Sequence, residues 1–183
     1  MAVRRAVRFR AEDIWDTPDD GNRYEVIDGD LYMTPPPVVI HQRGGGRLYR
    51  LIGNYLDRNP IGEVFMAPIG VTLDDSNGLQ PDIVYVSNER RDIIKERAIE
   101  GAPDLVVEVL SPSTESRDRG VKLRRYAASG IPHYWLLVPR TRSLEAYVLA
   151  DAGYDLVGTY GPGSVFRPAL FPGLDVPIDA LWS

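Results

Sequence analysis

Two acidic residues stand beside or inside apolar stretches, where acidic side chains are uncommon. Glu108 lies within the apolar run at residues 105–110, whose length and Val/Leu content are typical of a fully buried strand. Asp82 follows Pro81 and opens a second apolar run at residues 83–86. A buried carboxylate that stays ionised is costly unless it is paired or binds a metal. The two acids therefore indicate a charged site built on buried strands.

A basic helix follows Glu108 and supplies a candidate partner for it. Hydroxyl side chains after the strand can cap a helix that we expect to end at about Ser129. Residues 117–125 hold five basic side chains and a single acid, Asp118. Lys122 is spaced to lie on the side that faces the end of the strand. The alternative is a solvated helix face on which Asp118 and Lys122 form an ordinary i,i+4 pair.

Carboxylates on neighbouring strands can share one hard cation, because adjacent strands lie about 4.8 Å apart. Asp82, Glu108 and Lys122 therefore predict a site for Mg²⁺, with Mn²⁺ as the alternative. Such a cation can lower the pKa of a bound water and neutralise charge on a phosphate, while the lysine stabilises the transition state. The chain has no cysteine and two histidines, so any metal would be bound by oxygen. His41 could contact a ligand, although a cap or surface position at a helix start is the alternative.

The elements that must position these side chains can be predicted from the spacing of apolar residues. Residues 23–33 form two short strands around Asp28-Gly29, a strong signal for a tight hairpin. A helix is expected over residues 40–57, where three consecutive glycines imply a close backbone approach. Residues 88–100 predict a surface helix. The remaining strands are expected at residues 63–73, 134–138, 144–149 and 154–160.

Length and composition indicate one globular domain with a real core, since 44% of the 183 residues are hydrophobic. The strands and helices expected above make its fold class α/β (α+β). We expect an N-terminal arm at residues 1–22, a core at residues 23–160 and a tail at residues 161–183 that packs on the core. No apolar run approaches the roughly 18 to 20 residues of a membrane span, and no signal-peptide core is present. A cytoplasmic protein is expected.

The chain resembles the Uma-type family of restriction endonucleases, within the PD-(D/E)XK nuclease superfamily. The resemblance is carried by RYEVIDGDLYMTPPP followed by His41, by QPDIVYV, by DLVVEVLSPST, by Asp118, Lys122 and Tyr126, and by GIPHYWLLVP. It implies a restriction-endonuclease-like core, in which a mixed central β-sheet is flanked by helices and extended by β-hairpins. A second Pro-Asp pair elsewhere in the chain shows that the dipeptide alone is a weak motif.

The resemblance also implies roles for individual residues. Asp82 and Glu108 become the metal-binding carboxylates, and Glu25 becomes a third acidic member of the catalytic set. Without the resemblance, the sequence around Glu25 favours an exposed strand residue over a member of the site. The superfamily places a lysine two residues after the second acid, but Leu110 stands there in this chain. The family replaces that lysine from the following helix, which makes Lys122 the substitute.

Three further residues are implied as supporting members of the site. They are His41, Asp118 and Tyr126. The simplest role for Asp118 is to orient Lys122. His133 stands where the family usually has a glutamate, so no role is assigned to it.

The leading functional hypothesis is a metal-dependent endonuclease that hydrolyses phosphodiester bonds of DNA by attack of a metal-activated water. A homodimer is expected by analogy with nucleases that cut both strands. The alternative is a catalytically silent module for nucleic-acid binding or protein assembly, which the net charge of −5 and the pI near 5.1 favour. A glycosidase-like pair of carboxylates is a weaker alternative, because the acids lie beside a lysine instead of flanking a sugar site.

Overall fold

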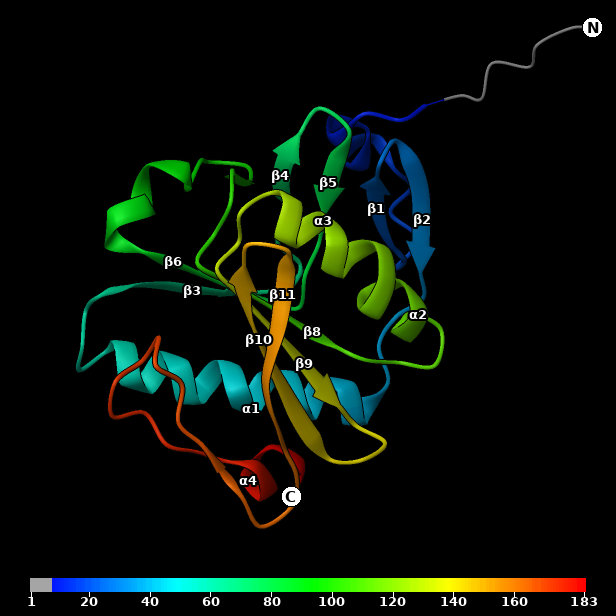
Figure 1. The fold of residues 1–183 in the computed structure, drawn as a ribbon. Helices are drawn as coiled ribbons and strands as arrows, with labels where there is room; N and C mark the ends of the chain where they lie inside the picture. Colours follow the sequence, from blue (N-terminus) through cyan, green and yellow to red (C-terminus); the bar gives the residue numbers. More distant parts are fainter. Residues whose placement is uncertain (1–7) are drawn as a thin grey trace, which may run out of the picture.

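The computed structural model describes residues 8–183, so residues 1–7 of the expected arm lie outside the described residues. The chain forms a six-stranded sheet, a five-stranded sheet and a two-stranded pair (Figure 1). The helical segments are a 3₁₀ helix (Ala11–Asp16), α1 (Val39–Leu56), a 3₁₀ helix (Asn88–Ile93), α2 (Glu115–Arg117), a π-helix (Asp118–Lys122), α3 (Leu123–Ala128) and α4 (Ile178–Trp182). None of these is long and apolar enough to cross a membrane.

The six-stranded sheet has the order β11-β10-β9-β8-β6-β3 and is mixed, because β8 and β9 run parallel while their neighbours run antiparallel. Its strands are β3 (Gly62–Met66), β6 (Ile83–Ser87), β8 (Leu105–Val109), β9 (His133–Val138), β10 (Ser143–Ala150) and β11 (Gly153–Tyr160). The mixed sheet flanked by helices confirms the predicted fold class.

The five-stranded sheet has the order β2-β1-β5-β4-β7. Its strands are β1 (Arg23–Ile27), β2 (Asp30–Thr34), β4 (Val71–Asp74), β5 (Asn77–Leu79) and β7 (Ile99–Glu100). Near the C-terminus, β12 (Val165–Phe166) pairs with β13 (Val176–Pro177). The five-stranded sheet brings the β1–β2 hairpin beside the ends of β6 and β8.

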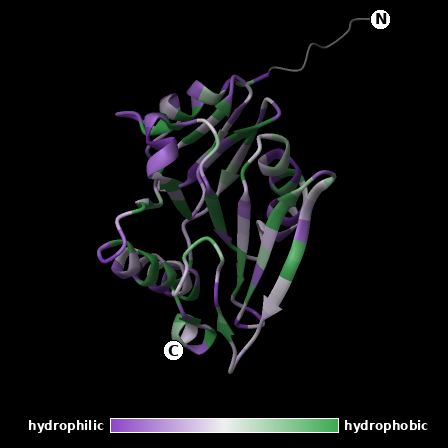
Figure 2. Cartoon of the chain, turned by 60° about the vertical axis from the view of Figure 1, so that its left-hand side comes forward, coloured by the Kyte–Doolittle hydropathy of each residue, from purple (hydrophilic) through white to green (hydrophobic). Residues whose placement is uncertain are grey.

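Both faces of the six-stranded sheet are covered, and β8 divides its side chains between them. Val107 and Val109 pack in the same cluster as the helix α1, while Val106 packs with Tyr126 of α3 on the other face. Figure 1 shows α1 low in the view and α3 high in it. Figure 2 shows hydrophobic residues along the central strands and hydrophilic residues at the outer loops. Glu108 shares the α3 face, as its strand position predicts.

The C-terminal tail packs on the α1 face. Phe166 and Phe171 both pack edge to face on Trp135, and their ring centroids lie 4.9 and 6.1 Å, respectively, from the centroid of Trp135. Trp182 belongs to the same buried cluster. The tail therefore completes the core beneath the sheet that carries the acids.

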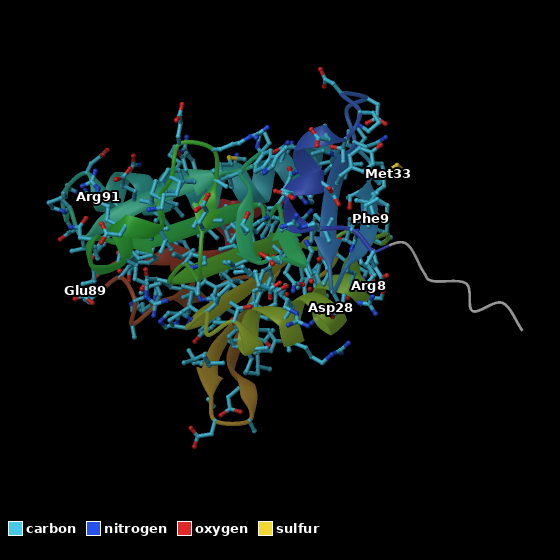
Figure 3. The ribbon with its side chains drawn as sticks, turned by 90° about the horizontal axis from the view of Figure 1, so that it is seen from above. Arg8, Phe9, Asp28, Met33, Glu89 and Arg91 are labelled. Carbon is cyan, nitrogen blue, oxygen red and sulfur yellow. The ribbon has the colours of Figure 1, made fainter. Side chains whose placement is uncertain are left out.

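The predicted hairpin forms around a turn in which Asp28 and Gly29 have φ of 54° and 79°. Two positive φ values in a row match the tight turn that suits the twist of paired strands. The chain before it is tied to this turn, since the Arg8 guanidinium donates to the Asp28 carbonyl at 2.8 Å. Figure 3 shows Arg8, Phe9 and Asp28 grouped at one end of the molecule.

The predicted surface helix at residues 88–100 is wrong beyond its first part. Only Asn88–Ile93 is helical, and the chain then forms a bridge between Ile94 and Ile99. Ile99–Glu100 pairs in parallel with β4, so this stretch adds an edge to the smaller sheet. Helix propensity is overridden here because Ile99 is buried against Val71 and Val84.

The glycines of α1 allow the close approach that the sequence predicts. A Cβ on Gly44 would lie 2.7 and 2.9 Å from two ring atoms of Trp182, and one on Gly45 would lie 3.4 Å from Val109. Gly53, on the same helix, has no such neighbour within 4 Å. At Gly44, therefore, the backbone of α1 lies so close to Trp182 of α4 that it leaves no room for a side chain.

Replacing Gly44 and Gly53 by alanine should change stability in opposite directions. Gly44→Ala should lower the free energy of unfolding by about 1 to 3 kcal/mol, because the added methyl overpacks against Trp182. Gly53→Ala should raise it by up to about 1 kcal/mol, since alanine is the better helix former and meets open space. Urea unfolding measures both. Equal stability of Gly44→Ala and the unchanged protein would contradict the packing.

Candidate active site

A cavity of about 360 Å³ opens where the β1–β2 hairpin, the start of α1, the ends of β6 and β8 and the segment after β8 meet. Seven ionisable side chains line it: Arg23, Glu25, His41, Asp82, Glu108, Asp118 and Lys122. Every site residue expected from the sequence is among them except Tyr126, which touches Glu108. The structure thus brings together residues that are spread over five segments of the chain.

Lys122 lies at the centre of three carboxylates. Its Nζ is 2.8 Å from Glu25 Oε1, 2.9 Å from Glu108 Oε1 and 3.5 Å from Asp118 Oδ1. The lysine side chain is only 3% exposed. Burial alone would lower the pKa of Lys122, but the carboxylates of Glu108, Glu25 and Asp118 raise it above its usual range. Lys122 therefore carries its positive charge inside the protein.

Glu108 is held by two donors on one of its oxygens. Lys122 Nζ and Tyr126 Oη donate to Oε1 at 2.9 and 2.8 Å. Burial raises the pKa of Glu108 to about 8, Lys122 opposes this rise, and Asp118 and other nearby acids add to it. The charged form of Glu108 is consequently costly to keep in this buried cluster without further positive charge.

Asp82 is paired differently, through both of its oxygens. Oδ1 accepts from Arg23 Nη1 at 2.9 Å, while Oδ2 accepts from the Val109 N–H at 2.7 Å and lies 3.3 Å from His41 Nε2. Burial alone would raise the pKa of Asp82, but the hydrogen bond from His41 and the charge of Arg23 lower it to about 2. Asp82 is therefore an ionised carboxylate at neutral pH.

A π-helix turns Lys122 toward the sheet. Asp118–Lys122 adopts this rare form, which widens the turn and re-aims side chains relative to an α-helix. Arg119 fixes the segment from outside, since its guanidinium binds both oxygens of Glu145 at 2.6 and 2.8 Å. From the buried side, Tyr134 Oη donates to the Asp118 carbonyl at 3.0 Å. These contacts hold the wider turn beneath the cavity.

Asp118 differs from the other acids of the cluster. Its Oδ1 is buried and accepts no hydrogen bond from the described residues, although Lys122 Nζ is 3.5 Å away. Burial raises the pKa of Asp118, partly offset by the charge of Lys122. Asp118 and Lys122 therefore do interact at the i,i+4 spacing, but through their charges and without a hydrogen bond.

Sequence reasoning missed two arginines. Arg23 pairs with Asp82, and it could have been found because it lies two residues before Glu25 on one strand and shares its face. Arg117 donates to Thr34 Oγ1 at 2.7 Å, stacks over Tyr32 and lies 4.0 Å from Glu25 Oε2. Glu25 itself is 1% exposed, so the exposed position considered for it is wrong.

The donor chemistry of the cavity suits a hard divalent cation. Four acids face it; Asp82 lies immediately before β6 and Glu108 lies within β8, its antiparallel neighbour. Within residues 8–183, no three His, Cys, Asp or Glu side chains group as a metal cluster. Two carboxylates are nonetheless enough for Mg²⁺, which keeps several waters and completes its shell with substrate phosphate. Asp82 and Glu108 are the residues that would hold it.

The mixed sheet and the cavity of carboxylates and lysine define a protein of the restriction-endonuclease-like class. A family model described as "Uma2: Putative restriction endonuclease" matches residues 11–179, and the chain belongs to this family. It is 32% identical over 139 residues to the uncharacterized protein slr1290 of Synechocystis sp., a match that covers 75% of this chain and 72% of that protein.

One solved structure has the same fold. It is a putative nuclease belonging to DUF820 from Anabaena variabilis, with a TM-score of 0.77 and 19% sequence identity over 95% of this chain and 97% of that one. The predicted family and fold are therefore confirmed.

Removing the charge of Lys122 should destabilise the fold strongly. Lys122→Met should cost about 3 to 5 kcal/mol at pH 7, because the buried carboxylates of Glu108 and Asp118 would lose the ammonium that lies against them. Without it the folded-state pKa values of Glu108 and Asp118 rise further, so these groups bind more protons in the folded state than in the unfolded chain. The stability of Lys122→Met should then increase as the pH falls from 7 toward 5.

Urea unfolding of Lys122→Met across this pH range measures the effect. Lys95→Met, at an exposed lysine, is the matched control and should stay within about 0.5 kcal/mol of the unchanged protein. A Lys122→Met variant that matches this control at pH 7 would show that the cluster does not depend on the ammonium.

Proposed function

We propose that this cavity hydrolyses phosphodiester bonds of DNA with the help of Mg²⁺ or Mn²⁺. The observation that carries the proposal is the convergence of Asp82, Glu108 and Lys122 on one cavity, with Glu25 beside them. Membership of a family described as restriction endonucleases supports DNA as the substrate. Hydrolysis adds a water oxygen to phosphorus and breaks one P–O ester bond, which leaves a phosphate monoester and an alcohol.

Asp82 and Glu108 are proposed to bind the cation and Lys122 to orient Glu108. When bound, a divalent cation lowers the pKa of a water and neutralises charge on the phosphate. Lys122 and Tyr126 hold Glu108 through Oε1, so its carboxylate stays fixed toward the cavity. The Val109 N–H fixes Asp82 in the same way. The chain thus supplies a preorganised set of charges, which is the main source of catalysis in phosphoryl transfer.

A catalytically silent module is the second candidate. Both oxygens of Asp82 already accept hydrogen bonds, and Lys122 is enclosed by acids. The net charge of −5 also works against phosphate binding over a broad surface. In this case the buried ion pairs serve the fold alone, and the protein acts through a partner.

The proposal includes a homodimer, because cutting both strands of a duplex takes two cavities. It also places the protein in the cytoplasm. Light scattering of the protein mixed with duplex DNA measures the mass of the assembly. A complex that holds two copies agrees with this part of the proposal, and one that holds a single copy contradicts it.

Cleavage of supercoiled and single-stranded DNA in the presence of Mg²⁺ or Mn²⁺ tests the function. Asp82→Asn and Glu108→Gln should each lower the rate by about a hundredfold or more, because each removes a charge needed at the phosphate. Asp175→Asn, at an exposed ion pair of the tail, is the control and should cut at the unchanged rate. EDTA should abolish cleavage.

Two results would contradict the proposal. Cleavage that survives in both Asp82→Asn and Glu108→Gln would place the activity outside this cavity. Absence of cleavage from a folded protein on both DNA forms, with either metal, would favour the silent module.

A further inference from the structure

The pairing of Arg23 with Asp82 stands where the proposed cation would bind. Arg23 Nη1 donates to Asp82 Oδ1 at 2.9 Å and to the Gln80 carbonyl at 2.7 Å. The Arg23 side chain is 17% exposed and lines the cavity. The guanidinium therefore uses a carboxylate oxygen that is a natural ligand for a hard cation.

We propose that Arg23 is a built-in competitor for the cation site and must leave Asp82 before a divalent cation can bind. This inference rests on the proposed function, because it takes Asp82 as a cation ligand. A guanidinium and a divalent cation cannot share Asp82 Oδ1 without strong repulsion between their charges. The apparent affinity for the cation is then the intrinsic affinity multiplied by the fraction of molecules in which Arg23 has left Asp82.

The charges around the cavity favour this exchange over simple addition. Four acids face the cavity, and two basic side chains that also line it, Lys122 and Arg23, are paired with them. Lys122 is enclosed by Glu25, Glu108 and Asp118 and cannot leave without exposing them. Arg23 instead has one acidic partner within salt-bridge distance and is the more exposed of the two cations, at 17% against 3%. Arg23 is thus the cation that can be exchanged.

Release of Arg23 also gives the guanidinium a second use. Its planar donor fork binds phosphate oxygens as well as carboxylates. A phosphodiester in the cavity would attract the released guanidinium and so favour the form that accepts the cation. Cation and substrate would then strengthen each other's binding by the same factor.

A calorimetric titration of Mn²⁺ into the protein tests the competition without any measurement of cleavage. Arg23→Gln should bind Mn²⁺ about tenfold more tightly than the unchanged protein, which corresponds to about 1.4 kcal/mol. A variant that only disturbed the fold would weaken binding instead. Arg23→Lys keeps the charge and should bind with an affinity between those of the unchanged protein and Arg23→Gln.

Arg117→Gln is the matched control for net charge. Like Arg23, Arg117 is half-buried, and it lies 4.0 Å from Glu25 Oε2 without contacting Asp82. Its loss should tighten Mn²⁺ binding by less than about threefold, because a loss of charge alone acts through the general field of the cluster. Thermal unfolding checks that each variant is folded.

The outcomes separate this inference from the proposed function. Tighter binding by Arg23→Gln that is lost in an Arg23→Gln, Asp82→Asn double variant supports the competition, even if the unchanged protein binds too weakly to measure. Binding that needs Asp82 but is unchanged or weaker in Arg23→Gln, or equally tightened in Arg117→Gln, overturns the competition and leaves the cation site standing. Absence of binding in both folded proteins overturns both.

Discussion

The buried ammonium of Lys122 is the interaction on which the site depends. It joins Glu25 of the hairpin, Glu108 of the six-stranded sheet and Asp118 of the π-helix within 3.5 Å. The charged forms of Glu108 and Asp118 would be more costly to bury without it, because an unpaired buried carboxylate is very costly. The same contact fixes the two sheets and the helical segment around one cavity. The same buried charges therefore stabilise the fold and form the proposed catalytic site.

Local patterns were enough to predict much of this arrangement. Glu108 interrupts a Val/Leu run, and the two-residue period of a strand assigns it to the face that α3 covers. The spacing of Lys122 along the following helix placed it on the side of the strand's end, and the structure agrees. Asp28-Gly29 predicted the hairpin because few residue pairs accept two positive φ values.

Contacts between distant segments could not be predicted in the same way. The pairing of Arg23 with Asp82 spans 59 residues and depends on β1 lying next to β5, which no local pattern specifies. The π-helix has no sequence signature of its own and is held by Arg119 and Tyr134 from opposite sides. The expected helix at residues 88–100 failed because burial of Ile99 outweighed local propensity.

The position of a bound cation tests the account most directly. Crystals grown with Mn²⁺ and measured for anomalous scattering locate the ion without reference to activity. The account predicts a peak between the carboxylates of Asp82 and Glu108, at oxygen distances normal for Mn²⁺, with Arg23 turned away from Asp82. An ion bound elsewhere, or crystals without an ion in which Asp82 remains paired with Arg23, would contradict it.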